Sequence, residues 1–221
     1  RFDQMGIAGH PVLKTPVIDG LARRGVRFTN AFVTTSICAA SRATFLTGRR
    51  EGRHNYTFGQ PPMGAKIGSE TYLARLHDAG YRTGFVGKWG VKFAKGALGD
   101  ALDYRRLPSY PILPKRDGKP GRHLTHRVEA AAIEFLKQQG PAAPDSKRPF
   151  CLSVSFHAPH AQDNHPDQYI PPPALASIYS EHEVPVPPLA TSGFDVLPDF
   201  LQTSLGRVRW AWRFANGAEQ V

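Results

Sequence analysis

The most constraining feature of this sequence is a helix-like segment followed by a strand-like segment, a pair that occurs three times. Each helix-like segment begins near a Thr or Ser suited to N-capping, carries apolar residues at helical spacing and ends at a Gly. Each strand-like segment is a short run rich in apolar or β-branched residues. The pairs are 15–25 with 26–33, 69–80 with 81–86, and 125–140 with 150–156. Repeated units of this kind predict an α/β fold with a mostly parallel central sheet.

Composition agrees with a globular α/β domain. The 221 residues are 41% hydrophobic, enough to bury a core, and the balance excludes disorder and coiled coil. No apolar run approaches the ~18 residues that a membrane helix needs, so no membrane span is predicted. We expect one partial domain over 1–221, in which 161–221 is a less regular extension. Prolines within 165–190 predict an extended surface crossing or a lid.

Basic residues are concentrated in the first half of the chain. The formal net charge is +10, and residues 1–110 hold 17 of the 28 Lys and Arg but 7 of the 18 Asp and Glu. This predicts an anionic partner, either a small anion in a site or nucleic acid. The run 207–213, with two Trp between Arg residues, fits a non-catalytic basic binding module only loosely. We therefore favour a small anion and expect no nucleic acid.

The segment 34–49 carries the chemistry. Small polar residues lead into a predicted helix, with Ser41 or a neighbour as its cap, so Cys38 is expected at a helix N-terminus. The helix dipole attracts anions there, and Arg42 adds a full positive charge one turn further on. This pattern favours a reactive cysteine in an anion site over a buried structural cysteine.

The motif Cys38-Ala-Ala-Ser-Arg42, followed by Leu46-Thr-Gly-Arg49, resembles the signature of the formylglycine-dependent, arylsulfatase-like sulfatases. Three further segments resemble the same family in the expected order: 9–22, Gly87-Lys-Trp89 and Ala158-Pro-His160. The resemblance implies a three-layer α/β/α fold of the alkaline phosphatase superfamily. It also implies hydrolysis of a sulfate ester, with a phosphonate or phosphate ester hydrolase as the alternative. The substrate is expected to be a sulfated small molecule or carbohydrate.

The resemblance also assigns roles to residues. Cys38 is expected to be converted to formylglycine by a maturation enzyme, and its hydrated form to attack the sulfur. Arg42 is expected to stabilise that nucleophile, and Lys88 to bind a sulfate oxygen and the ester oxygen. His160 is expected to contact the sulfate or the leaving alcohol as a donor or acid, with His157 and His165 as alternatives. Lys88 and His160 follow predicted strands, where open α/β sheets bind ligands.

Two departures from the family pattern stand out. Gly90 occupies a position where many members have His, and His123 or His126 are possible substitutes. The family also binds calcium, or magnesium in some members, through formylglycine, an Asp pair on its first strand and a later Asp-Asn pair. Hard cations need several oxygen ligands, yet only Cys38 matches this set, because Asp163-Asn164 lacks a preceding strand.

We therefore expect the chain to be truncated at both ends, with the Asp pair just before Arg1 and the other metal ligands outside this sequence. On that expectation the chain alone would be inactive and would not bind calcium tightly. The resemblance suggests a periplasmic or secreted protein.

Overall fold

The computed structural model describes residues 3–58, 61–140, 147–163, 165–183 and 196–203. The chain divides into two compact units, which are described separately. One comprises Arg1–Gly25 with Tyr179–Val221, and the other comprises Val26–Ile178. Among the described residues, no helix combines the length and the apolar character needed to cross a membrane.

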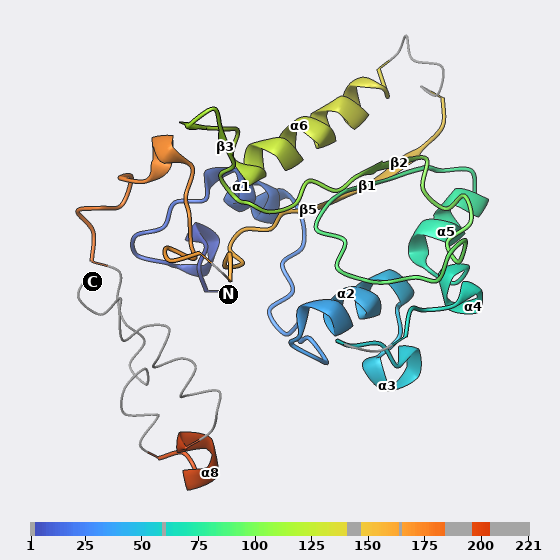
Figure 1. Cartoon of the computed structure of the whole chain (residues 1–221), viewed down its shortest axis with the longest axis horizontal. Coiled ribbons are helices and arrows are strands. Elements are labelled where there is room, and N and C mark those ends of the chain that lie inside the picture. The colour runs from blue at the N-terminus through green and yellow to red at the C-terminus, as the bar shows by residue number, and fades with distance from the viewer. Residues whose placement is uncertain (1–2, 59–60, 141–146, 164, 184–195, 204–221) are drawn as a thin grey trace. The chain divides into compact units, whose positions relative to one another are not determined.

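The unit Val26–Ile178 is built on a parallel sheet of three strands in the order β2-β1-β5 (Figure 1). β1 spans Arg82–Gly87, β2 spans Tyr104–Arg106 and β5 spans Phe150–Ser155. β1 is central and pairs with β5 along its whole length, from Arg82 opposite Phe150 to Gly87 opposite Ser155. The predicted parallel sheet is thus confirmed, as are the strands predicted at 81–86 and 150–156.

Helices cover both faces of this sheet. α6 (Leu124–Lys137) lies on one side, and α2 (Cys38–Thr47) and α5 (Tyr72–Asp78) lie on the other (Figure 1). Successive residues of β1 point to opposite faces of the sheet and belong to two separate hydrophobic cores. Phe85 packs in the core formed with α2 and α5, whereas Val86 packs in the core formed with α6. The arrangement is the expected three-layer α/β/α fold. The shorter elements of this unit are α3 (Glu51–His54), α4 (Ala65–Gly68), β3 (Lys115–Arg116), β4 (Lys119–Pro120) and η2 (Pro173–Leu175).

β5 forms an edge of the described sheet. Within the described residues it pairs with β1 alone. The sequence predicts a buried strand here, but Phe150 is 45% exposed and Val154 39% exposed. A strand of a parallel sheet is usually buried on both faces. The apolar side chains of β5 are therefore only partly buried, unlike those of a typical strand in a parallel sheet.

The other unit contains η1 (Gly6–Ala8), α1 (Pro16–Arg24) and α8 (Asp199–Gln202). The predicted helix at 15–25 is confirmed as α1. The Thr15 hydroxyl donates to Asp19 and accepts from the backbone N–H of Gly6, which ties α1 to η1. The extended segment predicted at 26–33, which begins the Val26–Ile178 unit, joins no sheet.

Two predicted helix starts are displaced. Ser69 is not the N-cap of α5 but the C-cap of α4, and the Thr71 hydroxyl caps α5 instead, accepting from Ala74 N. Likewise, α6 begins at Leu124, and His123 replaces the predicted Thr125 as its N-cap. In both cases the observed cap lies within two residues of the predicted cap. Sequence patterns locate helix ends less precisely than helices themselves.

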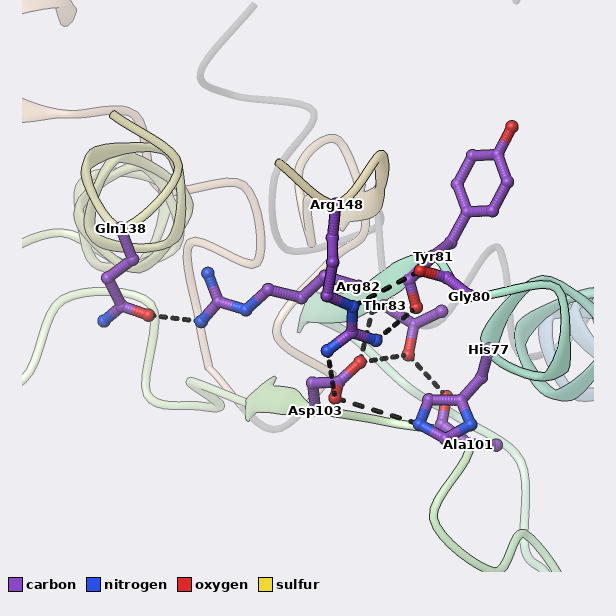
Figure 2. A network of polar contacts seen from close by, with 9 residues as sticks. All are labelled: His77, Gly80, Tyr81, Arg82, Thr83, Ala101, Asp103, Gln138 and Arg148. Carbon is purple, nitrogen blue, oxygen red and sulfur yellow. Dashed lines mark hydrogen bonds and ion pairs between the residues drawn. The ribbon is translucent and has the colours of Figure 1, made fainter. Parts of the chain in front are cut away.

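A polar network holds the N-terminal ends of β1 and β2 together (Figure 2). Asp103 Oδ2 accepts from the backbone N–H of Thr83 at 2.8 Å, and the Thr83 hydroxyl donates to Ala101 O at 2.7 Å. Asp103 Oδ1 lies 3.8 Å from both His77 Nε2 and Arg148 Nη1. Thr83 is fully buried. Asp103 is therefore the acceptor for a backbone donor that has no access to water.

We expect Asp103→Ala to lower the free energy of unfolding by about 1–3 kcal/mol, because it leaves the buried Thr83 N–H unpaired. Asp103→Asn keeps a carbonyl acceptor and is expected to cost less. Urea unfolding of the whole protein measures both changes. Asp100→Ala, at an exposed carboxylate nearby, is the control, and an equal effect at Asp100 and Asp103 would contradict this role.

Candidate active site

Cys38 is the first residue of α2. The expected position of Cys38 at a helix N-terminus is confirmed. Of the residues considered as caps, Ser41 lies inside the helix, and the N-cap is Ile37 in extended conformation. No side chain caps α2. The first-turn N–H groups therefore remain available to an anion at the point where Cys38 begins the helix.

Arg42 joins α2 to the carboxyl ends of two strands. Its Nη1 donates to the backbone oxygen of Lys88 at 2.5 Å and to the Ser155 hydroxyl at 2.6 Å. Lys88 directly follows β1, and its own N–H donates to Ser155 O at 2.8 Å. Cys38, Arg42 and Lys88 are thus brought together at the carboxyl ends of the strands. Open α/β sheets bind ligands at this end of the sheet.

Two glycines make this junction possible. Gly87 has φ +98°, and a Cβ there would lie 2.0 Å from Ser155 O, so only glycine lets β1 and β5 end this close together. Gly90 has φ +68°, and a Cβ there would lie 2.8 Å from Arg42 Cδ. The Arg42 side chain therefore lies directly against residue 90. A larger residue at this position, such as the His found in many family members, would require Arg42 to move.

Electrostatic effects connect these residues. Burial lowers the pKa of Arg42, while the charge of Cys38 opposes this shift. Burial also lowers the pKa of Lys88, and Arg42 adds to the effect, whereas the negative charges of Cys38 and Asp163 oppose it. Two cations held close together and partly out of water favour a bound anion, which would relieve their mutual repulsion.

One of the three candidate histidines, His157, lies close enough to Lys88 and Arg42 to be affected by their charges. His157 is 7% exposed, and its Nδ1 has no hydrogen-bond partner among the described residues. Burial, together with the charges of Lys88 and Arg42, lowers the pKa of His157 to about 4, so the ring is neutral at pH 7. The charge of His160, whose backbone N–H donates to His157 O at 2.8 Å, acts in the same direction. The third candidate, His165, is paired with Asp167 at 3.7 Å.

Tyr110 is a site residue that the sequence did not reveal. Its hydroxyl lies 3.1 Å from His160 Nδ1 and 2.9 Å from Ala161 O. Burial raises the pKa of Tyr110, and the charges of Asp163 and Cys38 raise it further. Tyr110 lies in a loop outside every predicted element, so no motif marks it. Ser155 could have been found, because it ends the strand that leads to the histidines.

The possible substitutes for His at position 90 have other environments. His123 Nδ1 accepts from Thr125 N, and its Nε2 lies 2.9 Å from Ile170 O, so both nitrogens are engaged in capping α6 and holding a loop. The His126 ring stacks edge-on against His123. The basic run 207–213 lies outside the described residues.

The described residues do not provide a set of ligands for the divalent metal that the family resemblance implies. No group of three or more His, Cys, Asp or Glu side chains there is close enough to hold a metal ion. The charged groups near Cys38 include Arg42 and Lys88, which would repel a cation. The described residues alone therefore do not fit calcium or magnesium.

A cavity of about 650 Å³ adjoins Cys38. It lies against α2 and β5, and its walls include Cys38, Arg42, Phe45, Tyr72 and Ser155. Apolar side chains such as Phe45 line the cavity together with polar groups from Cys38, Arg42, Tyr72 and three serines. The nucleophile candidate is thus accessible from this side.

Comparisons with known proteins identify the family of the chain. The family model described as Sulfatase matches residues 1–182. Arylsulfatase A of Bos taurus is 40% identical over 145 residues, which are 63% of this chain and 28% of that protein. An ulvan-active sulfatase of Formosa agariphila is 30% identical over 195 residues, covering 77% of this chain and 36% of that protein.

A solved structure described as a complex with its substrate, D-glucosamine-2-N,6-O-disulfate, has a TM-score of 0.65 at 24% identity. The match covers 85% of this chain and 37% of that one. At this identity it supports the fold alone. The chain spans about a third of the length of the relatives it matches. On the family match over most of its length, the chain belongs to the sulfatase family.

Proposed function

We propose that the protein containing this chain hydrolyses sulfate esters, with a formylglycine formed from Cys38 as the nucleophile. The observation that carries the proposal is the pair of hydrogen bonds from Arg42 Nη1, to Lys88 O and to Ser155 Oγ. These bonds bring Cys38, an arginine and a lysine to one edge of a parallel sheet. A sulfate ester is an anion, and more negative charge develops on its leaving oxygen as the bond to sulfur breaks.

The proposed reaction has two stages. One oxygen of the hydrated formylglycine attacks sulfur, the bond between sulfur and the ester oxygen breaks, and the leaving alcohol takes a proton. The second hydroxyl of the diol then loses its proton, the aldehyde re-forms and sulfate leaves. Water rehydrates the aldehyde. Lys88 binds sulfate and ester oxygens, and Arg42 stabilises the ionised diol.

His160 is the proposed proton donor to the leaving alcohol. Its Nδ1 lies 2.7 Å from Ala161 O, which can only accept, so Nδ1 carries a proton. In the imidazolium form Nε2 carries the second proton, and we propose that it passes this proton to the leaving alcohol, which leaves the ring neutral. We propose calcium or magnesium as the metal of the whole protein, held by the formylglycine formed from Cys38 together with ligands outside this chain. The maturation enzyme that converts Cys38 is also part of this proposal.

The relatives support sulfate esters as substrates, since arylsulfatase A, an ulvan-active sulfatase and human N-sulphoglucosamine sulphohydrolase are among them. The last is 31% identical over 177 residues, covering 75% of this chain and 31% of that protein. We propose a sulfated small molecule or carbohydrate as the substrate here. Phosphate and phosphonate esters are the competing class, because the same nucleophile could attack phosphorus.

Mass spectrometry of the tryptic peptide 28–42 from the whole protein, made in its native host, tests the modification. We expect the mass of a peptide in which the Cys38 thiol is replaced by an aldehyde, together with reaction with a hydrazine probe. The peptide that contains Cys151, from the same digest, should keep its thiol. An unmodified Cys38 in an active preparation would refute the formylglycine mechanism.

A further inference from the structure

Tyr110 connects the loop that follows β2 with the loop that follows β5, both in the Val26–Ile178 unit. Its hydroxyl lies 3.1 Å from His160 Nδ1 and donates to Ala161 O at 2.9 Å. A phenol has one hydrogen, so the bond to Ala161 O leaves only a lone pair of the Tyr110 oxygen for His160. His160 Nδ1 is therefore the donor to Tyr110, as it is to Ala161 O at 2.7 Å. Both partners of this nitrogen are acceptors.

These contacts leave Nε2 of His160 available to a substrate. Among the described residues Nε2 has no hydrogen-bond partner, and the side chain is half-buried. Ala161 is the next residue in the chain, so a bond to its carbonyl follows the loop when the loop moves. Tyr110 belongs to a separate loop, and its bond ties the ring to a point outside its own segment. A further bond between the two loops runs from Ile112 N to Gln162 Oε1 at 2.7 Å.

The backbone on both sides of Tyr110 is anchored to α6. Arg127 of this helix donates through Nη2 to Ser109 O at 2.9 Å and to Pro111 O at 2.6 Å. The Tyr110 ring also packs edge-on against His157, with centroids 5.3 Å apart. A side chain held in this way loses little further conformational entropy when its hydroxyl forms a hydrogen bond. Tyr110 is thus suited to hold another side chain in place.

His160 is connected to the cations of the site through the end of β5. Ser155, the last residue of this strand, accepts from Lys88 N at 2.8 Å and from Arg42 Nη1 at 2.6 Å. His157 follows two residues later, and its carbonyl oxygen accepts from His160 N at 2.8 Å. A movement of the loop that carries both histidines would therefore change their position relative to the cations.

We propose that Tyr110 is a positioning residue for proton transfer to the leaving alcohol, and that its hydroxyl holds the His160 ring so that Nε2 is presented to the ester oxygen. The proposal rests on the proposed function. The Nε2 proton passes to the ester oxygen as the bond between oxygen and sulfur breaks, and the ring is left neutral with its proton on Nδ1. Tyr110 itself exchanges no proton. Burial raises the pKa of Tyr110, which keeps the phenol protonated at neutral pH.

Tyr110→Phe in the whole protein tests this role, because it removes the hydroxyl and keeps the ring against His157. The probes are 4-nitrophenyl sulfate and 4-methoxyphenyl sulfate, which are similar in shape but release phenolates of different basicity. The more basic methoxyphenolate depends more strongly on a proton donor. We expect kcat to fall by about tenfold or more for the methoxyphenyl ester and by about threefold or less for the nitrophenyl ester, with little change in either KM.

Tyr81→Phe is the matched control, since it removes the same hydroxyl from a tyrosine at the opposite end of β1 from Lys88. It should leave the ratio of the two rates unchanged. Tyr110 is 39% exposed, so its replacement by Phe should not alter the thermal unfolding temperature.

A purely structural role for Tyr110 would lower both rates by the same factor. Equal decreases for the two esters, or no decrease for either, would therefore overturn this inference while leaving the proposed function intact. A wild-type protein that hydrolyses neither ester would overturn the proposed function and this inference with it.

Discussion

Replacing Cys38 with alanine is expected to lower kcat/KM for sulfate esters by about 10⁴-fold or more in the whole protein. Alanine cannot be converted to an aldehyde and supplies no oxygen to attack sulfur. Arg42, Lys88 and the dipole of α2 would remain, so substrate affinity should decrease less than the turnover rate. The measurement is steady-state hydrolysis of 4-nitrophenyl sulfate, with 4-nitrophenyl phosphate as the competing ester of the same alcohol.

Cys151→Ala is the matched control for this prediction. Cys151 is the other cysteine of the chain, is half-buried within β5 and does not touch the Cys38 cavity. Burial raises the pKa of Cys151, which disfavours a reactive thiolate. We expect its replacement to leave turnover within a few fold. If Cys38→Ala retained activity within about tenfold of wild type, the proposed nucleophile would be wrong.

Removal of the Lys88 ammonium is expected to lower kcat/KM by about 10²–10³-fold, the effect typical of losing one preorganised donor to a developing charge. Lys88 is positioned from its backbone, because its N–H is bonded to Ser155 O and its carbonyl oxygen to Arg42. The substitution Lys88→Ala should therefore remove the ammonium group without shifting the end of β1. A decrease in kcat exceeding any rise in KM would show that Lys88 acts mainly in the transition state.

Lys88→Arg and Lys66→Ala are the comparison variants. Lys88→Arg keeps a positive charge in the half-buried position and should recover part of the rate, although its wider, planar group differs in shape. Lys66 is exposed on α4, away from the cavity at Cys38, and its replacement should have little effect. Equal rates for Lys88→Ala and wild type would remove Lys88 from the mechanism.

The sequence predicted the framework of the Val26–Ile178 unit better than its details. β1 and β5 were predicted because apolar, β-branched runs followed helices, and both exist at the expected places. β2 was missed because Tyr104–Arg106 is short and mostly polar. The caps at Ser69 and Thr125 were wrong because a suitable hydroxyl or ring lies at a neighbouring position, and the tertiary structure decides between them.

The candidate site was predictable where local sequence carries the chemistry. Cys38 and Arg42 share one helix, and Lys88 follows a predicted strand, so a site at the carboxyl ends of the strands could be expected from a parallel topology. Tyr110 could not be predicted, because its contact with His160 joins loops that are 50 residues apart. The neutral state of His157 also depends on burial and on charges from other elements, which a motif does not encode.

The open edge of β5 has a consequence for handling the 221-residue chain. An edge strand offers a row of unpaired backbone groups, and here Phe150, Val154 and Phe156 next to it are 39–45% exposed. Such an edge is a template for adding a strand from another molecule. Made in isolation at high concentration, the polypeptide is therefore prone to self-association through β5, and a charged gatekeeper such as Val154→Lys would oppose it.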